Sequence, residues 1–297
     1  MKVRIIGAGA VGAVVADKLV RVTDTAFIVD EDRKERYKEG LLINGERVAF
    51  NLILPSAADK ADLLIFAVKN MQLEDAIEEA RPFVYENTVV MSLLNGIEAE
   101  EKLEEAYGKE KVLYAFITDL SSVHNGIETT CFSGGGTIVY GEKDNTRTKR
   151  VMDIAALFDK AGQRYVIPDD ILHEKWWKFM LNTCFNTLSA ILEADYAAIS
   201  ENTDFIRAVR VIAREVQNVA KAEGIELKQE DTEEIIKRVT SLRDHGKTSM
   251  LQDVLAGRET ENRYFAGAVS RLGRKHSIPT PISDFIAILL EAKRKCP

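Results

Sequence analysis

One stretch of the sequence places a charged side chain and two amides inside an otherwise apolar segment. Residues 176–186 read WWKFMLNTCFN, and Lys178, Asn182 and Asn186 recur there at four-residue spacing. Side chains four positions apart share one face of an α-helix. A lysine and two carboxamides along a mostly buried helix would form a polar furrow suited to a small, oxygen-rich substrate. The alternative is a lysine that extends its ammonium group to solvent while the asparagines bond to the backbone.

A second motif lies at the N-terminus. Residues 5–12 read IIGAGAVG, a G-x-G-x-x-G pattern made by Gly7, Gly9 and Gly12, between an apolar run and the small-residue segment AVVADKL. A strand, a glycine turn and a helix in this order are the context in which the pattern binds a dinucleotide. The first glycine permits the tight turn, the second lets the backbone approach a pyrophosphate, and the third lets helix and strand pack closely. The alternative is a glycine turn that merely packs.

The elements around these motifs differ between the two halves of the chain. Short β-like runs that are apolar on both faces are typical of parallel strands covered by helices on both sides of the sheet. The runs that fit are 2–6, 26–30, 62–68, 88–94 and 112–117. The segments 70–80 and 97–107 read as the amphipathic helices between them.

Two further segments predict antiparallel pairs. LLINGERVAF (41–50) predicts a hairpin around Asn44-Gly45. Residues 125–141 predict another pair, with its turn at the glycines 134–136.

Beyond Pro168 the strand-like runs stop and helical patterns follow. One apolar stripe comprises Phe205, Val209, Ile212, Val216 and Val219, and a less regular one comprises Leu251, Val254, Leu255, Phe265, Val269 and Leu272. The sequence therefore predicts an α/β fold, with an N-terminal Rossmann-type parallel-sheet domain (1–168) followed by an all-α C-terminal domain (169–297).

Composition narrows the class of protein. The 297 residues are 46% hydrophobic and 29% charged, enough for two domains with cores, and the net charge of −7 argues against nucleic-acid binding. No run reaches the roughly 18 apolar residues of a membrane span, and three glycines interrupt the run 5–16, so it does not read as a signal peptide. The three cysteines (Cys131, Cys184, Cys296) and four histidines lack metal or disulfide spacing. We expect a cytoplasmic protein with no metal, no nucleic acid and no membrane partner.

Taken in order, the motifs resemble those of the ketopantoate reductases (2-dehydropantoate 2-reductases) over nearly the whole chain. GAGAVG is similar to the family's N-terminal fingerprint, VKNMQ (68–72) to its second motif and LLNG (93–96) to its third. KFMLNTCFN resembles its K-x-x-x-N-x-x-x-N helix. SMLQD (249–253) followed by TEN (260–262) resembles its most specific signature, S-M-L-Q-D…T-E. The family fold is a Rossmann domain joined to an all-helical domain, with the active site in the cleft.

The resemblance implies roles on the substrate side. Lys178 matches the general acid that protonates the keto oxygen as hydride reaches carbon, and partial desolvation would lower its pKa. Asn182 and Asn186 match substrate-binding residues, Ser249 matches a serine that would meet the substrate carboxylate, and Glu261 matches a catalytic glutamate that contacts substrate or cofactor. The alternatives are a helix N-cap for Ser249 and a solvated helix charge for Glu261. Where the family often has a further asparagine, this chain has Tyr196 at or near the position.

The resemblance also implies roles on the cofactor side. Lys69 matches a lysine that approaches the cofactor, and Asn95 an asparagine near nicotinamide and substrate. The residues that would bind the dinucleotide are Gly7, Ala8, Gly9, Ala10, Val11, Gly12, Asp30 and Glu31. Asp30, eighteen residues after Gly12, suits a ribose hydroxyl.

The family mostly uses NADPH, with an arginine after the second strand that meets the 2′-phosphate. Counting from GAGAVG, that position holds Glu31, flanked by Asp30 and Asp32. Three carboxylates disfavour a phosphate, although Arg33 could pair with it. Alternatively, residues 31–34 simply begin a helix. The sequence favours use of NADH at least as well as NADPH.

These features together predict an NAD(P)H-dependent reductase of 2-dehydropantoate, a small 2-oxo acid, in pantothenate and coenzyme A biosynthesis. The alternatives are a reductase of another branched 2-oxo acid and a dinucleotide-sensing protein that has lost the chemistry. The joint presence of the polar candidate residues argues against the sensor. By resemblance, the helical domain would bind substrate and form a homodimer.

Overall fold

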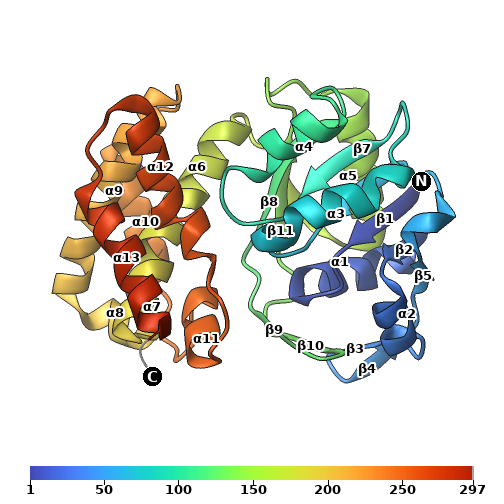
Figure 1. The fold of residues 1–297 in the computed structure, drawn as a ribbon, viewed down its shortest axis with the longest axis horizontal. Helices are drawn as coiled ribbons and strands as arrows, with labels where there is room; N and C mark the ends of the chain where they lie inside the picture. Colours follow the sequence, from blue (N-terminus) through green and yellow to red (C-terminus); the bar gives the residue numbers. More distant parts are fainter. Residues whose placement is uncertain (296–297) are drawn as a thin grey trace. The chain divides into compact units, whose positions relative to one another are not determined.

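The computed structural model describes residues 1–295, so Cys296 lies outside the described residues (Figure 1). The chain divides into two compact units, an N-terminal unit (Met1–Ile171) and a C-terminal unit (Leu172–Pro297). The boundary predicted at Pro168 falls shortly before this division.

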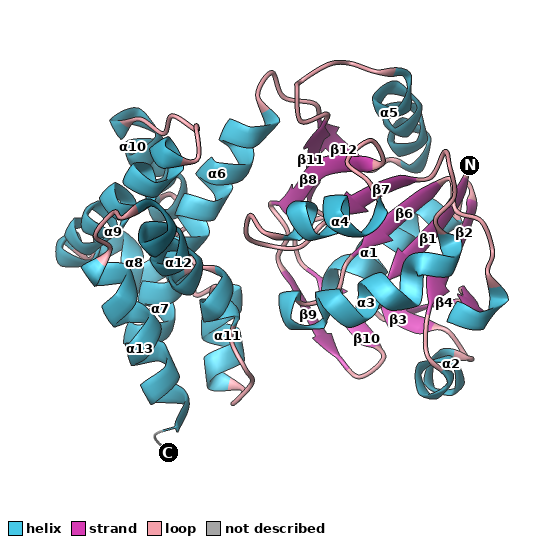
Figure 2. Cartoon of the chain, turned by 45° about the horizontal axis from the view of Figure 1, so that its top comes forward, coloured by secondary structure: helices cyan, strands magenta, loops and turns pink. Residues whose placement is uncertain are grey.

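In the described part of the N-terminal unit, an eight-stranded sheet has the order β12-β11-β8-β7-β6-β1-β2-β5 (Figure 2). Its strands are β1 (Lys2–Ile6), β2 (Asp24–Ile28), β5 (Asn51–Ile53), β6 (Leu63–Phe66), β7 (Val89–Ser92), β8 (Val112–Thr118), β11 (Thr137–Gly141) and β12 (Arg164–Val166). From β5 to β8 neighbouring strands are parallel, in the order of a doubly wound dinucleotide-binding domain. The predicted parallel sheet is therefore confirmed.

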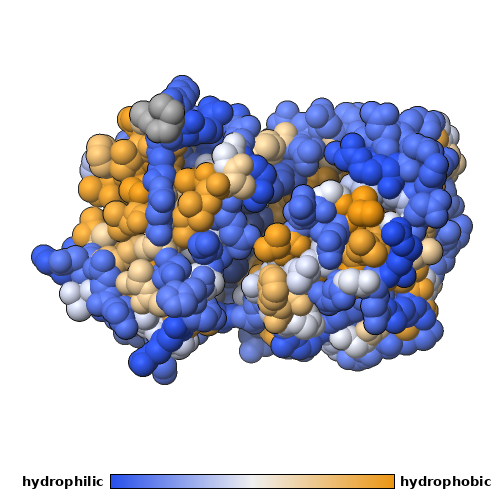
Figure 3. All heavy atoms as spheres, turned by 90° about the horizontal axis from the view of Figure 1, so that it is seen from below, coloured by the Kyte–Doolittle hydropathy of each residue, from blue (hydrophilic) through white to orange (hydrophobic). Residues whose placement is uncertain are grey.

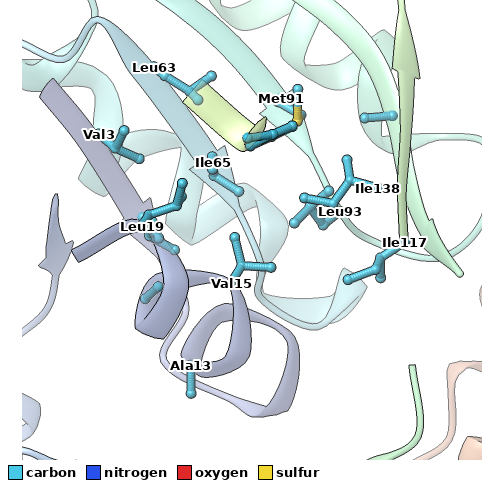
Figure 4. Packing of buried hydrophobic residues seen from close by; sticks show 14 of the residues in the cluster. Val3, Ala13, Val15, Leu19, Leu63, Ile65, Met91, Leu93, Ile117 and Ile138 are labelled. Atoms are coloured by element: carbon cyan, nitrogen blue, oxygen red, sulfur yellow. The ribbon is translucent and has the colours of Figure 1, made fainter. Parts of the chain in front are cut away.

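Helices cover both faces of this sheet because its strands are apolar on both faces. Helices α1 (Ala10–Val20) and α5 (Lys149–Ala161) pack on one face, where Val15 and Leu19 lie with Val3 and Ile65 in a single buried cluster (Figure 4). Helices α3 (Leu73–Ala80) and α4 (Ala99–Tyr107) cover the other face. The remaining helical segments of the unit are α2 (Glu31–Tyr37) and the short 3-10 turns η1 (Pro55–Ala57), η2 (Asn70–Gln72) and η3 (Arg81–Phe83).

A smaller sheet contains β4 (Glu46–Val48), β3 (Leu41–Ile43), β10 (Glu128–Cys131) and β9 (Ser122–Asn125), in that order. The predicted hairpin is confirmed: Asn44 and Gly45 both have positive φ, at 51° and 81°, and join β3 to β4. The prediction for 125–141 is wrong. β9 pairs with β10 around Gly126, whereas β11 joins the large sheet beside β8. The positive-φ glycines 134–136 connect the two sheets instead of closing a hairpin.

Within residues 172–295 every regular element is helical. After α6 (Ile171–Leu181) come the π-helical turn η4 (Asn182–Asn186), α7 (Thr187–Leu192), α8 (Tyr196–Glu201), α9 (Thr203–Ala222), α10 (Gln229–Thr240), α11 (Ser249–Leu255), the 3-10 turn η5 (Glu261–Tyr264), α12 (Ala266–His276) and α13 (Pro281–Lys295). The stripe predicted on α9 is buried. The less regular stripe is divided between α11 and α12, and Leu255 is exposed. No helix of the described residues is long and apolar enough to cross a membrane.

Candidate active site

The candidate cofactor residues gather at one edge of the large sheet. The glycine motif follows β1, Asp30 follows β2, Lys69 follows β6 and Asn95 follows β7. Because β2, β1, β6 and β7 are adjacent and parallel, their carboxyl ends lie together. Doubly wound sheets bind ligands at this edge, where the strand order reverses between β1 and β6.

The three motif glycines are required for different reasons. Gly7 has φ of +107°, and a Cβ there would lie 2.6 Å from the backbone of Ala67. A Cβ on Gly12 would lie 1.9 Å from the carbonyl oxygen of Gly7, so this pair needs glycine for folding. A Cβ on Gly9 would meet no described atom within 4 Å. Gly9 is the N-cap of α1, so its open side lets a phosphate reach the helix amides.

A side chain outside the predicted set holds two of the site loops together. Asn70 is buried, and its Nδ2 donates to the carbonyl oxygen of Asn95 over 2.9 Å. Lys69, which precedes it, is exposed. The bond fixes the loop after β6 to the loop after β7. The signal in the sequence was an amide next to Lys69 in VKNMQ.

The acidic segment after β2 forms the start of helix α2, so the alternative that residues 31–34 begin a helix is confirmed. Asp30 is the N-cap: its carboxylate accepts from the amide of Arg33 at 2.6 Å, and the Arg33 guanidinium lies 3.1 Å from it. Glu31 is exposed in the first turn. Burial raises the pKa of the nearby Glu79 carboxyl on α3, an effect that Arg33 opposes and Asp30 reinforces. Arg33 is thus paired with Asp30 and lies within electrostatic reach of Glu79.

In the C-terminal unit, the predicted furrow departs from an uninterrupted α-helix. Lys178 is half-buried on α6, and Asn182 and Asn186 are buried at the two ends of the π turn. The four-residue step from Asn182 to Asn186 is slightly more than one turn of an α-helix but slightly less than one turn of a π-helix. The Asn186 side chain is therefore rotated about the helix axis from the direction that α-helical spacing predicts. Such π turns occur frequently at functional sites.

The π turn is stabilised by a hydroxyl group. In the i→i+5 pattern, the amide of Thr187 reaches back one residue farther than in an α-helix, so the carbonyl of Thr183 loses its ordinary donor. The Thr187 Oγ1 donates to that carbonyl oxygen at 2.6 Å.

Ser249 begins α11 and is exposed, but it is not the N-cap, so that alternative is wrong. The cap is Thr248, whose Oγ1 accepts from the amide of Leu251 at 3.2 Å. Helix α11 packs against α7 and the π turn, which brings the start of α11 to the helix of the asparagines.

Glu261 is half-buried at the start of η5, which packs on α12 and α13. The neighbouring Asn262 anchors η5, because its Nδ2 donates to the carbonyl oxygen of Ala287 at 2.9 Å.

Comparison with known proteins identifies the family. The model for ketopantoate reductase PanE/ApbA matches residues 3–145, and the model for the C terminal of these proteins matches residues 170–294. The chain belongs to the ketopantoate reductase family.

Named relatives of the chain differ in their substrates. It is 29% identical to a 2-dehydropantoate 2-reductase of Pyrococcus horikoshii, over 99% of this chain and 97% of that protein. A crystal structure of 2-dehydropantoate 2-reductase from Geobacter metallireducens is 26% identical, with a TM-score of 0.87 and coverage of 98% and 99%. The ternary structure of D-mandelate dehydrogenase with NADH and anilino(oxo)acetate is 27% identical, with a TM-score of 0.89 and coverage of 99% and 98%.

Tyr196, which stands near the position of a further family asparagine, has a packing role. A Cβ added to Gly246 would lie 3.0 Å from its ring, and its amide donates to the Gly246 carbonyl oxygen at 3.0 Å. Burial raises the pKa of the Tyr196 hydroxyl. The tyrosine therefore supports the loop that leads to Ser249, and its hydroxyl stays protonated.

Proposed function

We propose that this oxidoreductase of the ketopantoate reductase family reduces 2-dehydropantoate to pantoate, for pantothenate and coenzyme A biosynthesis. The observation that carries the proposal is the half-buried Lys178, placed one helical turn before a π turn that holds two buried carboxamides. In such an arrangement the amides can bind the oxygens of a small 2-oxo acid, and the lysine ammonium group can protonate its keto oxygen.

The residues at the carboxyl edge of the large sheet fit a dinucleotide. The open side of Gly9 leaves room for the pyrophosphate at the N-terminus of α1, Asp30 would accept from a ribose hydroxyl, and Lys69 and Asn95 would lie nearer the nicotinamide. Ala8, Ala10 and Val11 contribute backbone to the same turn. When bound, the nicotinamide supplies the hydride.

The C-terminal unit supplies the proton and the substrate contacts. Lys178 donates its proton to the keto oxygen, and its positive charge stabilises the alkoxide as it forms. Asn182 and Asn186 donate amide hydrogens to substrate oxygens, and the Ser249 hydroxyl binds the carboxylate. Glu261 orients the charged groups of the site.

The direct test of this function is turnover of 2-dehydropantoate with NADH and NADPH, followed through nicotinamide absorbance with pantoate identified as product. Binding of the dinucleotide without turnover of any 2-oxo acid would instead support the sensor.

We also propose that NADH is used at least as well as NADPH. A 2′-phosphate bound after β2 would meet the acidic side chains of Asp30, Glu31 and Glu79, and Arg33 is paired with Asp30. That pair is exposed, so breaking it costs only about 0–1 kcal/mol. Arg33 is therefore the residue through which NADPH would still bind.

A second candidate function is reduction of a different 2-oxo acid, one with an aromatic group. Two observations favour it: Tyr196 stands near the position of a family asparagine, and the chain is as similar to D-mandelate dehydrogenase as to the reductases. Mandelate is the 2-hydroxy acid that corresponds to an aromatic 2-oxo acid, so the reaction chemistry would be unchanged.

We further propose that the C-terminal unit forms a homodimer. Ile282, Phe285 and Ile288 are spaced three residues apart on α13 and are exposed, at 37%, 62% and 67%. Residues with this spacing share a helix face. Figure 3 shows apolar atoms gathered on a face of the C-terminal unit. An exposed apolar stripe of this kind suits association with a second copy.

A further inference from the structure

Two buried hydroxyl groups join the helix of the asparagines to the start of α11. Ser189 lies on α7, three residues after Asn186, and Thr248 immediately precedes Ser249. Their Oγ atoms are 3.0 Å apart, although the residues are 59 positions apart in the sequence. Ser189 is 0% exposed and Thr248 is 3% exposed.

The hydrogen bonds around this pair run in one direction. The Ser189 hydroxyl donates to the carbonyl oxygen of Ala194 at 2.8 Å, which uses its single hydrogen. Thr248 must therefore be the donor to Ser189, while it accepts from the amide of Leu251. A buried network in which every member is satisfied holds its partners in one arrangement.

Ser189 is itself fixed by the end of its own helix. The amide of Ala194 donates to the carbonyl oxygen of Ser189 at 3.1 Å, after Glu193 turns the chain with φ of 51°. The Ser189 side chain therefore offers its lone pair to Thr248 from a set position. An ordinary N-cap needs no such partner, since a cap hydroxyl can donate to any nearby acceptor.

We propose that Ser189 and Thr248 are positioning residues that set the Ser249 hydroxyl relative to Asn182 and Asn186. The inference rests on the proposed function, because the position of Ser249 matters only if it binds the carboxylate of a 2-oxo acid. Neither residue touches the substrate; both act through Ser249.

The first test is Ser189→Ala, which removes the link to Thr248 together with the Ser189 bond to Ala194, but leaves the Thr248 cap. The KM for the 2-oxo acid should rise about three- to tenfold, the range for one hydrogen bond, while kcat and the KM for the dinucleotide change little. Thr248→Val should raise the same KM at least as much, because it removes cap and link together. Thr248→Ser keeps the hydroxyl and should restore the wild-type KM.

A matched control is Ser283→Ala in the same unit. The Ser283 hydroxyl is as buried as that of Ser189 and donates to Glu215 at 2.6 Å. Ser283 lies near the start of α13, whereas α13 reaches the helix of Ser189 at its other end, where Lys293 donates to the carbonyl oxygen of Ile191 on α7. Ser283→Ala should lower the melting temperature as Ser189→Ala does, yet leave the KM for the 2-oxo acid unchanged. An equal rise of KM in the control would overturn the inference.

The decisive comparison adds Ser189→Ala to Ser249→Ala. If Ser189 acts through Ser249, the double variant should have the same KM for the 2-oxo acid as Ser249→Ala alone. A KM raised by the product of the two single effects would mean that Ser189→Ala disturbs the unit independently of Ser249, and would overturn the inference. If Ser249→Ala raises KM but Ser189→Ala and Thr248→Val do not, the inference alone fails. If Ser249→Ala leaves KM unchanged, the proposed substrate contact of Ser249 fails as well.

Discussion

Lys178 is the residue on which the proposed chemistry depends. Lys178 is half-buried on the helix that leads into Asn182, so its charge acts in a medium less screening than water. Lys178→Ala should reduce turnover by roughly two to four orders of magnitude, the range for loss of a general acid. Dinucleotide affinity, measured by titration calorimetry, should not change. Lys237→Ala, at an exposed lysine of α10, is the control. Near-normal turnover of Lys178→Ala would show that this lysine only extends to solvent.

Cofactor choice is decided by side chains that follow β2. NADH should give a kcat/KM at least equal to that of NADPH with the same keto acid, because Asp30, Glu31 and Glu79 repel a phosphate. A preference for NADPH above about tenfold, ~1.4 kcal/mol, would contradict this and assign the phosphate to Arg33. If NADH is preferred, Glu31→Arg should move the ratio toward NADPH.

Among the helices and strands, those whose conformation depends on neighbouring residues were predictable from the sequence. Those whose conformation or pairing depends on residues distant in the sequence were not. The strand, glycine turn and helix of residues 2–20 follow from sterics that the three glycines display directly. The π turn was not predictable, because its residues are all buried and one inserted residue therefore leaves no change in the pattern of apolar and polar positions. β11 was assigned to the wrong partner because its pairing with β8 is set by the sheet and not by its own residues.

The glycine turn makes a prediction that separates folding from binding. Gly12→Ala should destabilise the fold by roughly 1–3 kcal/mol or more, since its Cβ would collide with the Gly7 carbonyl oxygen. Gly9→Ala should leave the free energy of unfolding nearly unchanged, because the added methyl meets nothing, but weaken dinucleotide binding about tenfold or more, since it occupies the pyrophosphate's path. Denaturant unfolding and calorimetry measure the two effects. Unaltered binding by a folded Gly9→Ala would remove the assigned role of this turn.

At the scale of the whole molecule, the candidate residues divide between the two units. The sheet edge of the N-terminal unit holds the candidates for the dinucleotide, and the C-terminal unit holds Lys178, Asn182, Asn186, Ser249 and Glu261. The sequence predicted these residues through motif resemblance, since spacing alone left Lys178 open to a surface role. It did not identify Asn70, whose amide bonds to the Asn95 carbonyl oxygen, or the hydrogen-bonded pair Ser189 and Thr248, because these partners are distant in the sequence.

The apolar stripe of α13 makes a prediction about assembly. Replacing both Phe285 and Ile288 by Glu should reduce the molar mass in light scattering from two chains to one, because charged side chains oppose burial of the stripe. Met152→Glu, at an exposed apolar residue of α5, should leave the dimer intact. A wild-type protein that is monomeric at assay concentrations would contradict the proposal.

We propose that the chain reduces a 2-oxo acid, with 2-dehydropantoate as the preferred substrate. The most direct measurement is kcat/KM, by nicotinamide absorbance, for 2-dehydropantoate, for other branched 2-oxo acids and for the aromatic 2-oxo acid that yields mandelate. We predict that 2-dehydropantoate has the highest value and that Lys178→Ala lowers the values for all substrates alike. A higher value for the aromatic acid, by about tenfold or more, would contradict the substrate assignment. No turnover of any 2-oxo acid by a protein that binds the dinucleotide would contradict the claim as a whole.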